Sequence, residues 1–352
     1  MLYVASLGIA LYLLLPLLPG LEQAALGLSR ASKPLLVTVL AVEVLSLLCY
    51  SELLARSVVA SSKMRPSLAR RRRAGIGPWF TFRLAVCGLG AGRVLPGGGA
   101  VLAAIALGAL GKRGLKAADV SAALAVSFTL VYGALCVLCV AAFGYLVAAR
   151  DIPTAVAVAV LAIPVLLVMV ALAARSGYRR SARVRRPFVE LAHEAERFLG
   201  RGRLLETAAE RAKRFAADLL RALEVASKRL LERPSRLTKL SALAFGYWFL
   251  DALCLFLVFA ALGTEVELWK LIVTYAVAQL VAVLPFMPPG GLGVAEGVFV
   301  SLFALLGVGP ETSLYPVLGY RLFNYWMPIL LAAIFYPTLR FGAKQARERK
   351  VR

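Results

Sequence analysis

Apolar runs long enough to cross a lipid bilayer recur from one end of this 352-residue sequence to the other. The hydrocarbon core of a bilayer is about 30 Å thick, so a helix needs about 20 apolar residues to cross it. Because lipid offers no hydrogen bonds to an exposed backbone, spanning segments must be helices or closed barrels. The runs are continuous and lack the two-residue alternation of barrel strands. The sequence therefore predicts an all-α polytopic membrane protein.

Six of these runs have the length of a full span. They lie at residues 2–18, 34–55, 118–147, 153–174, 240–262 and 314–339. The first run lacks a basic leader and a small-residue cleavage site, so we expect it to be retained as a span. Hydrophobic residues make up 61% of the chain, which is well above the share in soluble domains.

Two further apolar segments are interrupted by proline and glycine. Residues 78–110 contain the stretch RVLPGGG, and residues 271–306 contain LPFMPPGG. Two crossings need about 40 residues, so each segment is too short to cross twice and too long and broken to cross once. The pattern predicts a re-entrant hairpin in each segment.

The charges of the loops orient these hairpins. Residues 61–77 and 111–116, on either side of the first hairpin, are rich in Lys and Arg, which is typical of cytoplasmic loops. The second hairpin is flanked by the acid-bearing stretches GTEVELWK and GVGPETS, and the C-terminal tail is basic again. The hairpins are therefore predicted to enter from opposite sides, in an inverted repeat of residues 1–174 and 240–352. Both termini are predicted to be cytoplasmic.

Residues 175–239, between the two halves, form a basic segment with 18 Lys or Arg against 8 Asp or Glu. Its apolar residues recur at helical spacing, which predicts helices that lie on the cytoplasmic membrane surface and attract anionic lipid. The formal net charge of the chain is +22. This charge is concentrated in loops and accompanies no nucleic-acid-binding motif, so nucleic acid is not an expected partner.

Metal and cofactor chemistry is not expected. Cys136 and Cys139 form a C-x-x-C pattern, but no second pair and no nearby histidine accompanies it. All five cysteines lie in apolar segments, where we interpret them as small helix-packing residues. His193 is the only histidine in the sequence, and no nucleotide-binding loop or nucleophile motif occurs. The chain is therefore predicted not to be an enzyme.

Ionisable residues at membrane depth are the candidate site. Glu296 follows the Pro-Pro-Gly-Gly break, and a buried acid needs a partner, because an unpaired charge in a membrane costs several kcal/mol. Arg321 in the last span, with Asn324 three residues on and on the same face, is one predicted partner. Arg93, near the tip of the first hairpin, is the other. A purely structural Glu296–Arg321 ion pair remains an alternative. Arg83, Asp251, Glu43 and Glu52 are further ionisable residues, and the two glutamates are interpreted as helix-packing residues near the membrane ends.

The proline and glycine breaks are predicted hinges. Unwound backbone at membrane depth is tolerated where protein buries it or where it lines a water-filled cavity. Gly293, Gly297 and Ser301 recur every four residues, which predicts a small-residue face for close helix packing. The hinge residues are predicted to be Pro96, Gly97, Gly98, Pro289, Gly290, Gly291, Gly293 and Gly297.

The last 75 residues or so resemble a flippase-like family of integral membrane proteins, which shares the membrane region of lysylphosphatidylglycerol synthases. The resemblance rests on a Pro-Gly-Gly-x-Gly-x-x-Glu-Gly hairpin, a Leu-Gly-Val turn and a Tyr-Arg-x-x-x-Tyr pattern. Their positions here are Pro289, Gly290, Gly291, Gly293, Glu296, Gly297, Leu306, Gly307, Val308, Tyr320, Arg321 and Tyr325. The resemblance implies lipid translocation or a related lipid-handling role, and we expect the protein in a prokaryotic inner membrane. One departure is Ala103, which takes the place of a charged residue in the first hairpin.

The residues and the resemblance together predict a translocase for an anionic lipid. Arg93 and Arg321 would hold the headgroup, Glu296 would tune its occupancy, and Tyr320, Asn324 and Tyr325 would line the site. Two alternatives remain open: a scaffold that holds a lipid-modifying enzyme through residues 175–239, and an ion-coupled carrier of a small anion. Membrane lipids are the expected partners, and a homo-oligomer is a further option.

Overall fold

The computed structural model describes residues 33–62, 76–95, 98–149, 232, 234–282 and 293–348. Regular structure in these ranges is helical throughout, with no strand. The predicted spans at residues 2–18 and 153–174 lie outside the described residues, as does the predicted cytoplasmic segment up to residue 231. The all-α fold is confirmed for the described part of the chain.

Four long apolar helices form the body of the described structure. They are α3 (Lys33–Ser61), α7 (Ala117–Ala149), α11 (Pro234–Ala261), and a continuous helix made of α14 (Pro310–Arg321), η3 (Leu322–Trp326) and α15 (Met327–Glu348). With 29 residues, α3 is about 44 Å long, enough to cross a bilayer. Four predicted spans are thus present as helices. The third of these helices, α11, begins at Pro234, within the segment predicted to lie on the cytoplasmic surface.

The two broken segments form pairs of short helices. The first pair is α5 (Pro78–Val94) and α6 (Gly99–Gly111), and the second is α12 (Leu268–Ala282) and α13 (Val294–Leu305). The longest of the four, α5, has 17 residues and spans about 25 Å. Each helix is therefore shorter than the hydrocarbon core. The described helices end and resume on either side of residues 96–97 and 283–292, the stretches that contain most of the predicted proline and glycine breaks and that lie outside the described residues.

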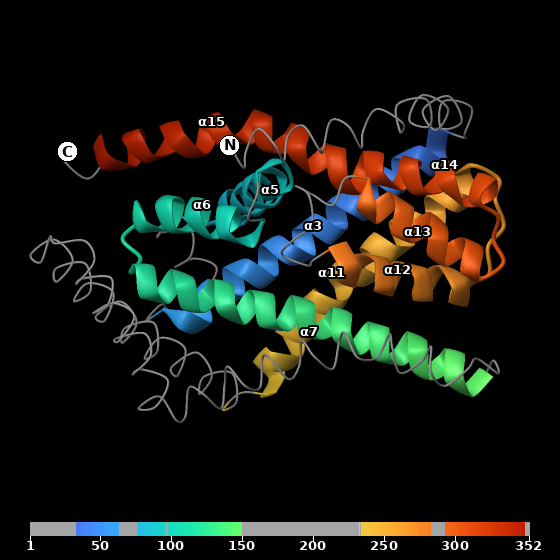
Figure 1. Ribbon diagram of the computed structural model, residues 1–352. Helices are drawn as coiled ribbons and strands as arrows, with labels where there is room; N and C mark the ends of the chain where they lie inside the picture. The colour runs from blue at the N-terminus through green and yellow to red at the C-terminus, as the bar shows by residue number, and fades with distance from the viewer. Residues whose placement is uncertain are drawn as a thin grey trace, which may run out of the picture.

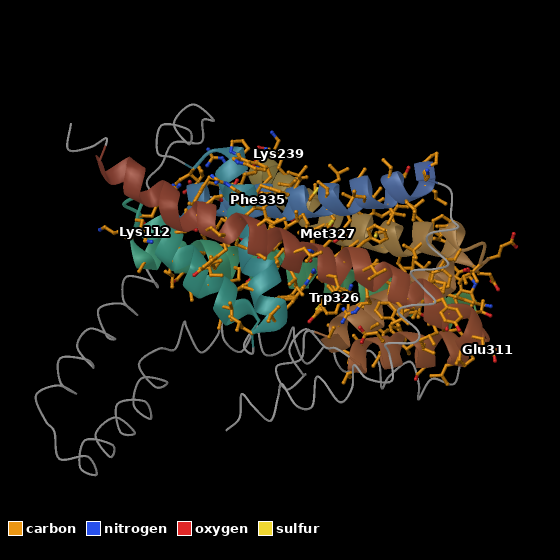
Figure 2. The ribbon with its side chains drawn as sticks, turned by 90° about the horizontal axis from the view of Figure 1, so that it is seen from above. Lys112, Lys239, Glu311, Trp326, Met327 and Phe335 are labelled. Atoms are coloured by element: carbon orange, nitrogen blue, oxygen red, sulfur yellow. The ribbon has the colours of Figure 1, made fainter. Side chains whose placement is uncertain are left out.

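The helix pairs occupy opposite ends of the molecule. Figure 1 shows α5 and α6 at one end and α12 and α13 at the other, with α3 and α11 between α7 and α15. Lys112, after α6, and Glu311, at the start of α14, lie at opposite ends of the molecule in Figure 2. The basic turn after α6 and the acid-bearing turn before α14 are therefore separated along the long axis of the helices.

Glycine allows α5 to approach two helices closely. A Cβ on Gly88 would lie 2.7 Å from Cγ of Leu102, and one on Gly92 would lie 2.7 Å from the carbonyl oxygen of Gly98. These matched contacts show that α5 and α6 run antiparallel. A Cβ on Gly90 would lie 2.3 Å from the carbonyl oxygen of Pro328, so α5 also touches the backbone of α15.

Gly90→Ala is expected to lower the free energy of unfolding by about 1–3 kcal/mol, the usual cost of overpacking. The added methyl group would meet backbone rather than a movable side chain. Denaturant unfolding in detergent measures the effect. The matched control is Gly108→Ala in α6, where no described atom beyond the neighbouring helix backbone lies within 4 Å of the new Cβ. This control is expected to be neutral or slightly stabilising, because alanine favours helices. Equal stability of the two variants would contradict the close α5–α15 contact.

The predicted small-residue face on α13 is not packed against described residues. Gly297 and Ser301 are exposed in this part of the chain, and no described atom lies within 4 Å of a Cβ built on Gly297. The prediction that this face packs closely is therefore wrong for the described structure. Close packing instead involves α5, because its glycines face two helices at once.

Hydrogen bonds join the long helices to one another. Trp248 Nε1 of α11 donates to the carbonyl oxygen of Val131 in α7 at 2.7 Å, and Ser46 Oγ of α3 donates to that of Tyr247 at 2.9 Å. Cys139 Sγ donates to the carbonyl oxygen of Ala276 in α12 at 3.2 Å. Because lipid tails are as apolar as leucine, packing and interhelical hydrogen bonds such as these hold membrane helices together. The packing role predicted for the cysteines agrees with the Cys139 contact.

Candidate functional site

The last long helix widens at its centre, between Arg321 and Met327. Residues 322–326 form the π-helical turn η3, and the N–H of Met327 donates to the carbonyl oxygen of Leu322, five residues back. The next residue is Pro328, which has no N–H to offer the carbonyl oxygen of Asn324 four residues earlier. Turns of this kind interrupt helices frequently at functional sites. Here the turn directs polar groups to two neighbouring clusters.

The first cluster, which we call the arginine cluster, consists of Arg93, Glu296, Arg321 and Tyr325. Arg321 Nε donates to Glu296 Oε1 at 2.5 Å, and the Arg321 and Glu296 side chains are 9% and 4% exposed. The ring of Tyr325 lies 4.5 Å from Cζ of Arg321 and 6.0 Å from Cζ of Arg93. The predicted pairing of Glu296 with Arg321 is thus present, and an aromatic ring brings both arginines to one place.

Glu296 is held at the start of α13 by its own backbone. Its Oε2 accepts a hydrogen bond from the N–H of Gly293 at 2.7 Å, which is the half of a capping box that the third helical residue supplies. Gly293 has φ of +79°, a conformation that favours glycine. Both carboxylate oxygens therefore have partners, and the N-terminal end of the helix dipole adds to the stabilisation of the negative charge.

Arg93, at the end of α5, reaches across to η3. Its Nη1 donates to the carbonyl oxygens of Asn324 and Tyr325, and its own carbonyl oxygen accepts a bond from the Tyr325 hydroxyl at 3.1 Å. The carbonyl of Asn324 is the one that Pro328 leaves without an N–H donor four residues on. Among the described residues, Nε and Nη2 of Arg93 have no hydrogen-bond partner, so this half-buried guanidinium has donors available for a ligand.

The second cluster, the aspartate cluster, surrounds Asp251 of α11. Asp251 Oδ2 accepts hydrogen bonds from Tyr275 (2.5 Å), Tyr320 (2.8 Å) and Gln279 (3.0 Å). Asn324 Nδ2 donates to Oδ1, and Gln279 Nε2 also contacts the Tyr320 hydroxyl at 2.8 Å. Asp251 is only 1% exposed. Four donors from three other helical segments therefore hold one buried carboxyl group.

A second acid lies beside Asp251. Glu43 of α3 is 1% exposed. Its carboxyl group lies beside the carboxyl group of Asp251 and the thiol of Cys254. Glu43 Oε2 is buried without a hydrogen-bond partner among the described residues. The interpretation of Glu43 as a packing residue near a membrane end is therefore wrong, because its side chain reaches the polar centre. Glu52 is part-exposed and pairs with Arg56 at 2.8 Å.

Asn324 joins the two clusters. Its side chain binds Asp251, and its carbonyl oxygen accepts from Arg93. The prediction that Asn324 shares a face with Arg321 at one site is wrong: Arg321 binds Glu296, whereas Asn324 and Tyr320 bind Asp251. The physical reason is that Tyr320 and Asn324 are four residues apart on one face, and Arg321 and Tyr325 form the adjacent face.

Sequence reasoning missed Tyr275 and Gln279. Both are polar, four residues apart and set in the otherwise apolar helix α12, a spacing that places them on one face. This spacing repeats that of Tyr320 and Asn324 and was the available signal. Arg83, the other arginine of α5, donates to Thr338 Oγ1 of α15 at 3.0 Å and lies outside both clusters.

The structure brings Arg93, Glu296, Arg321 and Tyr325 together and directs Tyr320 and Asn324 to Asp251. Of the predicted hinge residues, Gly98, Gly293 and Gly297 are described, and Gly98 has φ of +35° at the α5–α6 turn. Pro96, Gly97, Pro289, Gly290 and Gly291 lie outside the described residues. The described side chains contain no group of three or more potential metal ligands.

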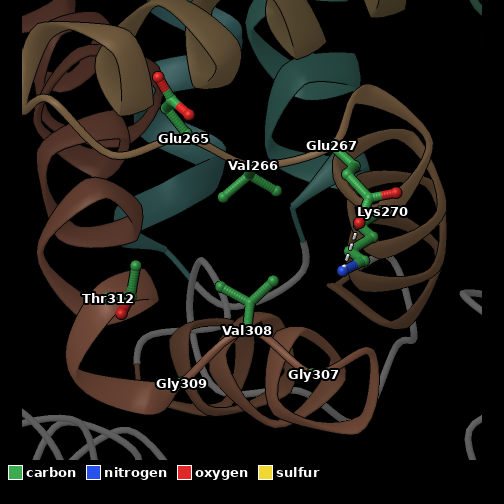
Figure 3. A pocket seen from close by; sticks show the side chains of 8 residues that line it. All are labelled: Glu265, Val266, Glu267, Lys270, Gly307, Val308, Gly309 and Thr312. Carbon is green, nitrogen blue, oxygen red and sulfur yellow. Dashed lines mark ion pairs between the residues drawn. The ribbon is translucent and has the colours of Figure 1, made fainter.

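A separate pocket lies at the acidic end of the molecule. Its volume is about 220 Å³, and it opens between the start of α12 and the turn from α13 to α14. Figure 3 shows Glu267 and Lys270 on one wall, with their ion pair of 2.8 Å, and Val308 and Thr312 on the other. Residues at the start of α12 and in the turn that follows α13 thus line one pocket.

The fold and both clusters define an all-helical membrane protein with a buried polar centre. The family described as the lysylphosphatidylglycerol synthase TM region matches residues 3–332, and the chain belongs to this family. A UPF0104 membrane protein of Methanothermobacter thermautotrophicus is 27% identical over 118 residues, which are 34% of this chain and 35% of that protein.

Two further relatives match over similar lengths. A UPF0104 membrane protein of the same organism is 36% identical over 97 residues, which are 27% of this chain and 27% of that protein. The inner membrane protein YbhN of Escherichia coli is 32% identical over 91 residues, 26% of this chain and 28% of that protein. The aligned stretches thus span about a third or less of the relatives' length.

Proposed function

We propose that this membrane protein translocates an anionic lipid, with the arginine cluster as the headgroup site. The observation that carries the proposal is the convergence of two arginines, a carboxylate and a tyrosine at the centre of an apolar helix bundle. Ionisable residues at membrane depth are expensive to maintain and usually serve transport. A guanidinium binds phosphate through parallel hydrogen bonds, so an anionic phospholipid headgroup fits this site.

The short helix pairs support a re-entrant, inverted arrangement. Arg93 ends α5 and Glu296 begins α13, so each lies next to the break of its pair, and both contact residues 321–325 of the long helix. Two broken segments that meet at a polar centre are a recurrent design of transporters that alternate access. The acidic and basic ends support cytoplasmic termini in a prokaryotic inner membrane.

Exchange of partners at Arg321 provides a mechanism for binding and release. A headgroup phosphate would displace Glu296 from Arg321, and Glu296 would keep its bond to the N–H of Gly293. Arg93 would supply its unused Nε and Nη2 donors. Movement of the glycine hinges would then open the site toward the other side, and Glu296 would return to Arg321 as the lipid leaves.

Native mass spectrometry of the gently purified protein, followed by transfer of labelled lipid in vesicles, tests the proposal. We expect wild type to retain one anionic lipid class. Arg93→Ala should weaken retention at least about tenfold, since one lost charge-assisted hydrogen bond is worth about 1.5–3 kcal/mol. Glu296→Gln should retain lipid more tightly and transfer it more slowly, because the competing carboxylate is gone.

The matched control is Arg56→Ala, which removes an arginine from an exposed pair on α3. It should leave lipid retention and transfer unchanged. If Arg93→Ala and Arg56→Ala behave alike, or if wild type carries bulk lipid only, the headgroup site is wrong. If a soluble anion binds at Arg93 and the vesicles show no lipid transfer, the result would favour the alternative function, a carrier of a small anion.

A further inference from the structure

We propose that Glu43 and Asp251 form a buried carboxyl pair that holds one exchangeable proton and couples its binding to that of the anionic headgroup. This inference rests on the proposed lipid translocation for the coupling, but the proton site stands on its own geometry. It assigns a role to Glu43, whose carboxyl group neighbours Asp251 and Cys254.

The first support is the adjacency of two buried acids. Glu43 and Asp251 come from α3 and α11 and are each 1% exposed. Two unit charges 4 Å apart repel by about 4 kcal/mol at an effective dielectric constant of 20. Two neighbouring carboxyl groups in such a place therefore share a proton rather than ionise together.

The hydrogen bonds indicate which acid carries the proton. Asp251 accepts from four donors, which stabilises its carboxylate form. Glu43 Oε2, in contrast, has no hydrogen-bond partner among the described residues. A buried carboxylate oxygen without a donor is far more costly than a neutral acid. The proton therefore belongs on Glu43, between the two acids.

The surroundings favour a proton over a metal cation. A cation such as Na⁺ needs several free oxygen ligands, but the oxygens of Asp251 are already occupied by hydrogen-bond donors.

Other ionisable groups from four helices also face the carboxyl pair. They are Tyr247 and Cys254 from α11, Tyr275 from α12, Tyr320 from α14 and Arg93 from α5.

Arg93 links the pair to the headgroup site, because its charge acts on both Glu43 and Asp251. When the proton is bound, the pair has a net charge of about −1, and Arg93 retains more of its attraction for a lipid anion. Loss of the proton doubles the negative charge and competes with that anion for Arg93. Proton and headgroup therefore bind together and leave together, and Asn324, which contacts both Asp251 and Arg93, is the structural connection.

Infrared difference spectroscopy of the protein in lipid nanodiscs, between acidic and alkaline buffer, tests the proton site without transport. Wild type should show a carboxylic acid C=O band that disappears on the alkaline side. Glu43→Gln should lack this band, whereas Glu52→Gln, on the exposed side of the same helix, should keep it. A band that survives Glu43→Gln, or its absence from wild type, would overturn the proton site.

Glu43→Asp provides a second variant should the glutamine variant fold poorly. It keeps the acid but shortens the side chain, so the band should persist at a shifted frequency. An unchanged frequency would show that the titrating acid lies elsewhere and would contradict the assignment.

Lipid affinity in the same buffers tests the coupling. Wild type should bind the retained lipid about 5–150-fold more tightly in acid than in alkali, the usual range for coupled sites. This difference should disappear in Glu43→Gln. Persistence of the difference, or its replacement by a dependence on Na⁺, would overturn proton coupling. If wild type binds no lipid but Glu43→Gln still removes the band, the lipid function fails and the proton site holds.

Discussion

Arg321→Ala is expected to lower the free energy of unfolding by about 3–5 kcal/mol, because it leaves Glu296 buried without its cation. The pair is almost inaccessible to solvent, so water replaces little of the lost interaction. Denaturant unfolding in detergent micelles measures the loss. The control Arg56→Ala removes a part-exposed pair and should cost about 1 kcal/mol or less.

A double variant separates stability from function at this site. Glu296→Gln combined with Arg321→Met removes both charges and should recover most of the lost stability, since apolar or neutral replacements of buried pairs are often tolerated. Lipid retention should stay low in the double variant, because the guanidinium is still missing. Recovery of both properties together would mean that the ion pair is purely structural. A loss in Arg321→Ala no larger than in Arg56→Ala would contradict its burial.

Asp251→Ala is expected to cost about 2–4 kcal/mol of unfolding free energy. Four donors would lose their acceptor, and interhelical hydrogen bonds in membrane proteins contribute about 0.6 kcal/mol each, with more for a charged acceptor. The same unfolding assay tests this. Ser46→Ala, which removes a single bond between α3 and α11, is the control and should cost about 0.6 kcal/mol.

The two variants differ by the number of donors left without a partner. If Asp251→Ala were as stable as Ser46→Ala, Asp251 would not be the hub that joins α11, α12, α14 and η3. The loss of unfolding free energy in Asp251→Asn should lie between those of Asp251→Ala and Ser46→Ala. An amide keeps one acceptor oxygen but replaces the other with a donor.

Hydrophobic run length predicted the described spans well, because the bilayer thickness fixes how many residues a crossing helix needs. The ends of α5 at Val94 and α12 at Ala282 were equally predictable, since the proline and glycine that follow in the sequence are poor helix formers. The need of Glu296 for a cation also followed from the sequence. The sequence did not decide whether Arg321 or Arg93 pairs with Glu296, because spacing along the chain does not measure distance in space.

The sequence by itself determined the membrane class, the charge asymmetry of the loops and the set of ionisable residues at membrane depth. Only the tertiary structure decided how these residues are shared between two clusters. Arg93 and Asn324 are 231 positions apart, and their contact depends on how α5 packs against the last helix. The π-helical turn and Pro328 then set which carbonyl and side chain face each cluster. Helix rotation and packing, which apolar composition specifies weakly, therefore placed Asp251 and Glu43 at the centre.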